Sequence, residues 1–235
     1  NNLTNISMTD KYAAICGLTD DELHTVFDPD VEILAEKYQC TKEEMYAMLR
    51  QKYDGYYFGK NKINVYNPYS LTNAFKNIDL GDYWFGSGTP SYLFPQMKKY
   101  NTDVMSLSRL EVSARQFDVP TEAMASALPL LYQSGYLTIK DYDEAGNVYT
   151  LDFPNAEVKV GFLESFMGSV LGVYNCDTQG WANRIYVGLL RNDIEKAMLA
   201  LQACFKAIPY LDHGGRQLDD IAKYEAFYEV ITFIV

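Results

Sequence analysis

The chain has 235 residues, of which 48% are hydrophobic and 22% charged, a composition that argues for a folded globular protein and against disorder. Its 31 acidic and 20 basic residues give a formal charge of −11, which disfavours extensive contact with nucleic-acid phosphates. No apolar run reaches the roughly 18 residues needed to span a bilayer, and no signal peptide is visible. We therefore expect a cytoplasmic protein that crosses no membrane.

Helix signals dominate the first part of the chain. Capping-box patterns at 19–22 and 41–44 place a threonine hydroxyl and a glutamate three residues apart. The helix that begins at 41–44 should run to about Lys52. Asp28 with Pro29 offers an N-cap followed by a proline at the first helical position. Asn67-Pro68 starts another helix. The first 118 residues therefore read as a helical lid.

From Val119 the pattern changes to a helix followed by a hairpin. The helix begins at 120–122 and should continue to residue 132. Strands at 136–141 and 148–153 follow, joined by a turn at 144–147. A helix that leads directly into a hairpin is typical of a winged-helix domain near its wing.

The remaining chain is predicted to be helical again. Pro154-Asn155 caps a helix from about 156 to 171, and a helical hairpin follows at about 179–190 and 193–207. A last helix begins near Leu218. We predict a mainly α fold with a small β-hairpin, divided into a helical part (1–118), a winged-helix-like segment (119–175) and a third domain that begins at 176 and continues to 235.

The glycine-rich segment 55–61 is compared with a phosphate-binding loop, which has the form G-x-x-x-x-G-K-[ST]. Here the two glycines lie one residue too close, the final hydroxyl is missing, and three bulky aromatic residues stand where the loop must be small. The segment also follows a helix, whereas the motif follows a strand. We interpret it as a turn.

A second candidate is a magnesium-dependent nuclease of the PD-(D/E)xK type, for which Asp152, Glu157 and Lys159 match the spacing. However, Glu157 and Lys159 fall in a predicted helix, where residues two apart point about 200° away from each other. Glu157 also suits the first turn of a helix, because a carboxylate there complements the helix dipole. The helix interpretation is favoured.

No metal site and no catalytic residue is predicted. The four cysteines are far apart, and His24 and His213 lie in unrelated segments, so neither a zinc site nor a nucleophile with its base is indicated. The cysteines are Cys16, Cys40, Cys176 and Cys204. Scattered single cysteines fit reduced thiols in a cytosolic protein.

The tyrosine-rich segment 53–58 has two interpretations. Four aromatic residues with a glycine and an aspartate are costly to expose, so the segment could be a packed loop that seals a domain junction. Alternatively it faces a ligand. Our candidates for residues facing a nucleotide are Tyr53, Asp54, Gly55 and Tyr56.

Several segments, in order along almost the whole chain, resemble one family: bacterial AAA-ATPase-like proteins with a C-terminal PD-(D/E)xK nuclease-like domain, common in gut Bacteroidetes such as Bacteroides. They are 5–8, 11–17, 53–58, 65–70, 87–91, 130–139, 153–158, 161–162 and 208–210.

The resemblance implies an ATPase core that binds ATP and Mg²⁺ before Asn1, and nuclease carboxylates beyond Val235. The uncapped apolar run 228–235 likewise suggests that the chain is a piece of a longer protein, cut at both ends. We expect no cofactor in this piece, whose partners would be the ATPase core and the nuclease-like domain.

Three functions follow as hypotheses. The first is a non-catalytic connecting piece that couples nucleotide state to the nuclease-like domain. The second is a stand-alone metal-dependent nuclease that uses Asp152, Glu157 and Lys159. The third is a protein-interaction module whose surface is rich in tyrosine, 20 in all, and which could form a homo-oligomer.

Overall fold

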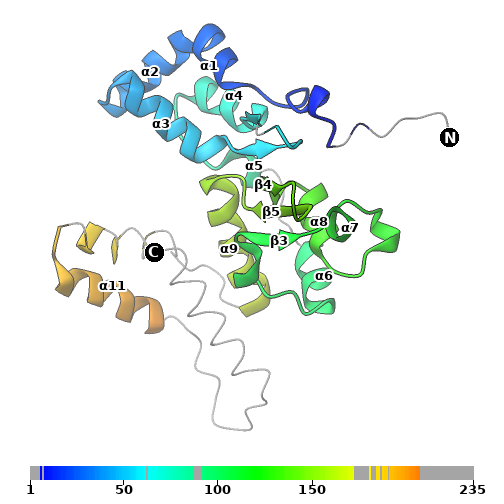
Figure 1. Cartoon of the computed structure of the whole chain (residues 1–235). Coiled ribbons are helices and arrows are strands. Elements are labelled where there is room, and N and C mark those ends of the chain that lie inside the picture. The colour runs from blue at the N-terminus through cyan, green and yellow to red at the C-terminus, as the bar shows by residue number, and fades with distance from the viewer. Residues whose placement is uncertain are drawn as a thin grey trace. The chain divides into compact units, whose positions relative to one another are not determined.

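The computed structural model describes residues 6, 8–61, 63–86, 92–171, 180, 184–185, 187–189 and 191–206. The fold is mainly helical with small antiparallel sheets, as predicted (Figure 1). Two compact units divide after Gly161, and each is described by itself. The helices are α1 (Asp20–Val26), α2 (Asp28–Tyr38), α3 (Lys42–Tyr53), α4 (Pro68–Asn77), α5 (Tyr83–Gly86), α6 (Leu93–Lys99), α7 (Ala114–Phe117), α8 (Leu128–Gln133), α9 (Ala156–Leu171) and α11 (Ile194–Lys206), with 3-10 turns η1 (Asp10–Tyr12), η2 (Met105–Leu107) and η3 (Thr121–Ala123).

The first four α-helices begin largely where the sequence predicts. Thr19 and Thr41 each form a complete capping box with the glutamate three residues later. The Asn67 Oδ1 atom accepts hydrogen bonds from the amides of Tyr69 and Ser70 at the start of α4. These caps satisfy amides that a helix leaves without partners at its N-terminus, so they fix the starts of α1, α3 and α4.

The predicted start of α2 is wrong by one residue. The N-cap is Phe27, and Asp28 is already helical. The Asp28 carboxylate instead accepts hydrogen bonds from the Lys42 ammonium at 2.6 Å and the Tyr46 hydroxyl at 2.7 Å. A tertiary contact to α3 has therefore replaced the local cap.

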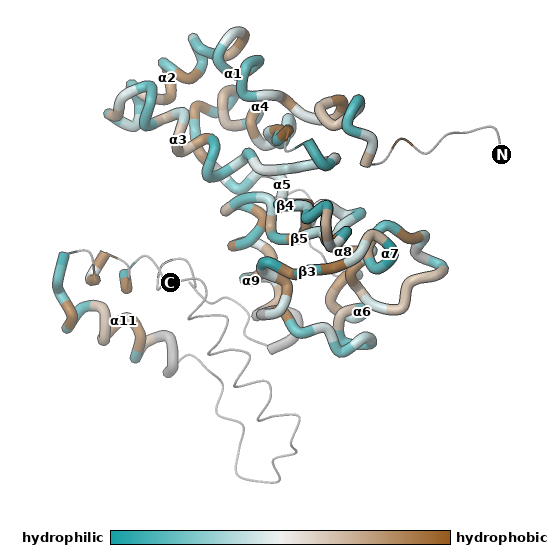
Figure 2. Tube along the Cα trace, viewed as in Figure 1, coloured by the Kyte–Doolittle hydropathy of each residue, from teal (hydrophilic) through white to brown (hydrophobic). Residues whose placement is uncertain are grey.

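One hydrophobic core holds α1 to α4 together. Their buried apolar residues pack into one cluster, and Figure 2 shows hydrophobic and hydrophilic residues alternating along these helices. Burial of a large apolar side chain contributes roughly 1.5–3 kcal/mol, so this core is the main source of stability for the helical part. Its buried members are Leu23, Val31, Leu34, Ala35, Met45, Tyr46, Leu49, Tyr53, Tyr66, Leu71 and Ala74.

The first unit also contains two small antiparallel sheets. Strands β1 (Tyr56–Tyr57) and β2 (Asn64–Val65) form a two-stranded ribbon directly after α3. Strands β3 (Leu110–Val112), β4 (Thr138–Asp143) and β5 (Val148–Asp152) form the second sheet in the order β3-β5-β4. The predicted hairpin is thus confirmed as β4–β5, and its third strand comes from before the predicted boundary at 118.

The continuous helix predicted from 120–122 to 132 is wrong. Only a 3-10 turn forms at Thr121–Ala123, and α8 starts afresh at Leu128. Pro129 explains the break, because a proline inside a helix lacks the amide donor and its ring clashes with the carbonyl four residues earlier. In the first turn of α8 the same proline breaks no hydrogen bond of the helix, because the amides there have no partner within the helix.

The helix predicted at 156–171 is confirmed as α9, and the second arm of the predicted helical hairpin is α11. In the first arm, residues 180, 184–185 and 187–189 are helical. Within the second unit Ile185 packs against Ala197 and Ala200. The predicted helix near Leu218 and the end of the chain lie outside the described residues. No helix within the described ranges is long and apolar enough to cross a bilayer.

Candidate functional site

The segment 53–58 leads from α3 into β1, and its first residues are built into the protein. Tyr53 is fully buried, and its hydroxyl donates to the Gly81 carbonyl at 2.7 Å. Asp54 is only 2% exposed, and the Asn64 side-chain amide donates to its Oδ2 atom. Burial raises the pKa of Asp54, because a charged carboxyl loses hydration there. Its Oδ1 atom has no hydrogen-bond partner among the described residues.

Gly55 is held in a conformation that only glycine adopts easily. Its φ is +98°, and a Cβ atom at this position would lie 2.2 Å from the Pro154 carbonyl oxygen. The Lys140 ammonium on β4 donates to the carbonyls of Gly55 and Pro154, each at 2.7 Å. Burial lowers the pKa of Lys140 to about 8, although Asp152 and Asp54 oppose this effect.

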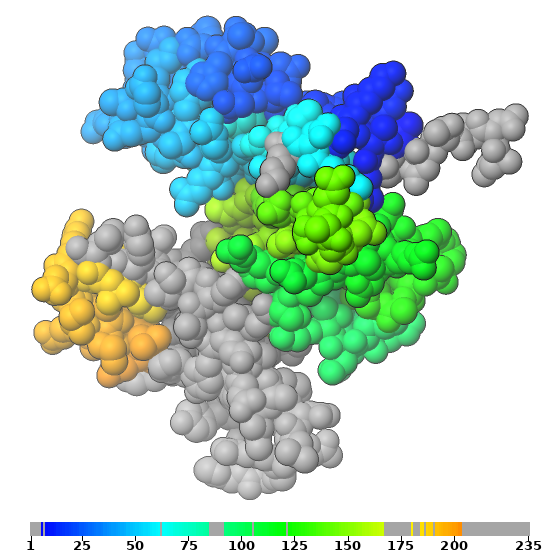
Figure 3. Space-filling model, viewed as in Figure 1, coloured from blue at the N-terminus to red at the C-terminus, as the bar shows by residue number. Residues whose placement is uncertain are grey.

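Two more side chains fix the segment to its surroundings. The Thr138 hydroxyl on β4 accepts from the Tyr57 amide at 2.9 Å and donates to the Tyr57 carbonyl at 3.0 Å. The Asn155 amide donates to the Asp54 carbonyl at 3.0 Å, while its Oδ1 atom accepts from the Val158 amide and so caps α9. In Figure 3 the cyan atoms of this region lie directly against the yellow-green β4–β5 hairpin. The segment therefore forms a junction between α3, β4 and the start of α9.

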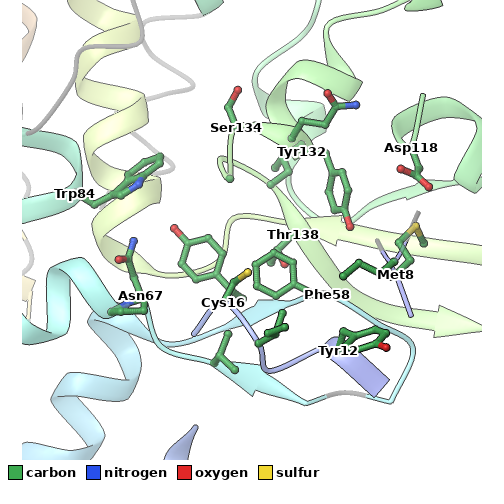
Figure 4. A pocket seen from close by; sticks show the side chains of 18 of the residues that line it. Met8, Tyr12, Cys16, Phe58, Asn67, Trp84, Asp118, Tyr132, Ser134 and Thr138 are labelled. Carbon is green, nitrogen blue, oxygen red and sulfur yellow. The ribbon is translucent and has the colours of Figure 1, made fainter. Parts of the chain in front are cut away.

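The second half of the segment opens into a cleft of about 960 Å³ (Figure 4). This size is within the range of small-molecule sites. The lining comes from η1, the β1–β2 ribbon, α4, α5 and α8 with the turn after it. The lining residues are Ile6, Met8, Tyr12, Ile15, Cys16, Tyr56, Phe58, Val65, Tyr66, Asn67, Pro68, Tyr69, Trp84, Asp118, Val119, Pro120, Tyr132, Gln133, Ser134, Gly135, Leu137 and Thr138.

Of the four residues predicted to face a nucleotide, Tyr56 lines this cleft, whereas Tyr53, Asp54 and Gly55 do not. Tyr56 is 8% exposed, and its buried hydroxyl has no hydrogen-bond partner among the described residues. Burial raises the pKa of this hydroxyl far above its usual value, and the nearby Asn67 side chain opposes that effect. Tyr56 therefore stays a neutral phenol, able to donate and to accept one hydrogen bond.

The lining carries little charge. Asp118 is its single ionisable carboxylate, and no lysine or arginine belongs to it. Phosphate groups in proteins are usually held by lysine, arginine or a row of backbone amides. The cleft therefore does not fit ATP with Mg²⁺ by itself.

The segment 55–61 is a turn, and its amides already hold an anion of the protein. The amides of Lys60 and Asn61 donate to the Asp10 Oδ1 atom at 2.6 and 3.1 Å. A Cβ atom on Gly59 would lie 2.4 Å from the same oxygen. The loop thus binds a carboxylate from η1 where a phosphate-binding loop would bind phosphate.

The proposed nuclease residues have separate structural roles. Glu157 is 1% exposed in the first turn of α9, where its two oxygens accept from the Ser70 hydroxyl at 2.7 Å and the Trp84 amide at 2.8 Å. Asp152 on β5 accepts from the Ser108 hydroxyl. Lys159 is near enough to Asp152 for that carboxylate to raise its pKa, while burial lowers it more. This arrangement links α9 to α4 and α5 and brings no carboxylate pair together.

Neither metal ligands nor a nucleophile with its base are gathered in the described part of the chain. No group of three or more histidine, cysteine or acidic residues there could hold a metal ion. His24 stacks on Tyr46 with ring centroids 3.8 Å apart. Cys16 is exposed and lines the cleft, and Cys40 is half-buried. His213, Cys176 and the side chain of Cys204 lie outside the described residues.

Sequence reasoning missed Lys140, Thr138 and Asn155 as junction residues, and Asn67 and Gly135 as cleft residues. A lysine or threonine on a strand gives no signal for the chain segment it will touch. The family resemblance did point to this region, because four of the segments that carry it supply most residues of the junction and many of those that line the cleft. They are 53–58, 65–70, 130–139 and 153–158.

The chain is similar to a protein of Azotobacter chroococcum mcd 1 described as an uncharacterized protein in the vnfD 5' region. The two are 30% identical over 241 residues, which cover 99% of this chain and 42% of the relative. The chain thus spans less than half the length of that protein. No family model and no solved structure matches it.

Proposed function

We propose that this chain is a non-catalytic connecting part of a longer protein that resembles the AAA-ATPase-like proteins with a PD-(D/E)xK nuclease-like domain. Its role is to couple the nucleotide state of the ATPase core to the nuclease-like domain. A relative more than twice as long agrees with this proposal. ATP and Mg²⁺ belong to the rest of that longer protein, because neither the cleft nor the 55–61 turn fits them.

The junction at 53–58 carries the proposal. One short segment is bonded to the helical part through Tyr53, to β4 through Lys140 and Thr138, and to the first turn of α9 through Asn155. Asn155 caps α9, and this helix continues past Gly161, so the segment is bonded to the start of the helix that crosses the division at Gly161. A displacement of 53–58 must break these hydrogen bonds or move the start of α9 with it.

Such a junction suits a coupling element for a physical reason. Coupling between distant sites needs an element with two arrangements that both sites bias. The Lys140 ammonium bridges two carbonyls from different segments, so its contacts change together if either segment moves. Of the four residues predicted to face the nucleotide, Tyr56 alone opens to the cleft, but the cleft has no basic lining residue and does not fit ATP, so the coupling role is assigned to the junction and not to the cleft.

The test uses the full-length protein, with ATP hydrolysis and DNA cleavage both measured. In Lys140→Met we expect ATP hydrolysis to persist and the dependence of DNA cleavage on ATP to be lost. The exposed Lys76→Met on α4 is the matched control and should leave that dependence intact. A full-length protein that hydrolyses no ATP, or whose cleavage responds equally to ATP in both variants, contradicts the proposal.

The stand-alone nuclease makes the opposite prediction. It requires metal-dependent DNA cleavage by the 235-residue chain, lost in Lys159→Ala. The hydrogen bonds of Glu157 to Ser70 and Trp84 argue against it, because this carboxylate is already occupied in the interior.

A further inference from the structure

We propose that the aromatic cleft is a binding site for a small uncharged molecule with a flat aromatic ring and a hydrogen-bonding edge. This inference goes beyond the coupling role and does not depend on it, because it concerns a ligand bound by this chain alone. A nucleoside and a free nucleobase share this chemistry, and the experiment below separates them.

The walls of the cleft suit a flat ring. Tyr56 and Phe58 lie nearly parallel, with an angle of 9° between their planes, and Trp84 contributes a further aromatic face. Gly135, with φ +77°, lies between them, since a Cβ atom there would be 3.6 Å from the Tyr56 ring and 3.9 Å from the Trp84 ring. A side chain at 135 would therefore project between these two aromatic residues. Aromatic rings prefer offset-stacked or edge-to-face neighbours of this kind.

Two polar groups at the floor provide the hydrogen-bonding edge. The buried Tyr56 hydroxyl has no partner among the described residues, and a buried polar group left unpaired costs about 1–3 kcal/mol. The Asn67 Oδ1 atom is occupied by the cap of α4, so its Nδ2 group is the part of this side chain that can donate, and the side chain is near enough to the Tyr56 hydroxyl to affect its pKa. A ring with an acceptor at its edge satisfies both groups at once.

The charge of the lining disfavours an anionic ligand. Asp118 is exposed and is the one charged residue among the lining residues. A phosphate or carboxylate in the cleft would find no cationic partner and would lose hydration without compensation. Binding should therefore weaken when negative charge is added to an otherwise suitable ring.

The experiment follows the fluorescence of Trp84, which lines the cleft. The chain has two tryptophans, so a Trp181→Phe background leaves Trp84 as the single reporter. Adenosine, adenine and ATP are titrated separately. We expect saturable quenching by adenosine or adenine, at least about tenfold tighter than by ATP. The better of the two neutral probes shows whether the ligand is a nucleoside or a free nucleobase.

The Tyr56→Phe variant tests the floor of the cleft. Loss of one hydrogen bond should weaken the better neutral probe about two- to tenfold, whereas Tyr53→Phe, a buried tyrosine outside the cleft, should not change its affinity. An independent readout is alkylation of Cys16, which the bound probe should slow, with Cys40 as the internal reference. The proposal is wrong if no neutral probe saturates at millimolar concentration, if ATP binds as tightly, or if Tyr56→Phe binds as well as the parent.

Discussion

The two halves of the segment 53–58 are adjacent in sequence and opposite in environment. In the first half, Tyr53 and Gly55 have their polar groups bonded to Gly81 and Lys140. In the second half, Tyr56 ends in a buried hydroxyl without a partner, and Phe58 lies exposed in the cleft. The junction and the ligand-facing interpretations of this segment therefore apply to different halves of it.

This difference has a thermodynamic consequence. The first half should contribute to the stability of the free protein, because the Tyr53 hydroxyl and the Gly55 carbonyl each have a partner within the fold. The second half should contribute little, because a hydroxyl that loses hydration without gaining a bond opposes folding. Substitutions in the two halves can therefore be compared directly by urea unfolding.

The largest loss of unfolding free energy, about 3 kcal/mol or more, is expected for Gly55→Ala. Its new methyl group would collide with the Pro154 carbonyl oxygen, and the φ of this residue is positive. Gly135→Ala has the same kind of φ, but the nearest atoms of its methyl group lie 3.6 Å away. It should cost about 1 kcal/mol. Equal losses in the two variants would show that the contact with Pro154 is not what constrains Gly55.

The next effect depends on pH and concerns Lys140. Between pH 8 and about 10 the folded protein has released the Lys140 proton while the unfolded chain still holds it. Stability should therefore rise with pH in this range, by up to about 2 kcal/mol. Urea midpoints of the parent and Lys140→Met should show that this rise is absent in the variant. A rise of the same size in both would mean that Lys140 does not titrate there.

A smaller loss, about 1 to 2 kcal/mol, is expected for Asn155→Ala. This change removes the hydrogen bond to the Asp54 carbonyl and the cap of α9 together. Asn73→Ala, within α4, removes a side-chain hydrogen bond to the Tyr69 carbonyl of the same helix and should be nearly neutral. If the two variants unfold at the same urea concentration, the bond between 54 and 155 does not hold the junction.

The smallest and sharpest comparison uses the same chemical change in each half. Tyr53→Phe loses a hydrogen bond to the Gly81 carbonyl and should cost about 1 kcal/mol. Tyr56→Phe removes a hydroxyl without a partner and should leave the stability of the free chain within about 0.5 kcal/mol. A larger loss at Tyr56 than at Tyr53 would reverse the assignment of the two halves.

Local signals predicted the elements whose determinants are close in sequence. The capping boxes at Thr19 and Thr41, the Asn67 cap and the turn of the β4–β5 hairpin each depend on residues within one turn or one hairpin. The predictions failed where a distant contact or a proline intervened. Asp28 bonds to α3 instead of capping α2, and Pro129 interrupts the helix predicted from 120–122 to 132.

The sequence by itself determined that this protein is mainly helical, where most of its helices begin, and that Glu157 and Lys159 fall on a helix. Only the tertiary structure decided that Tyr53 is bonded while Tyr56 is not, and that Lys140 joins Gly55 to Pro154. The reason is sequence separation. Caps and hairpins are set by neighbours a few residues apart, whereas the junction and the cleft bring together residues about a hundred positions apart, whose partners no local pattern specifies.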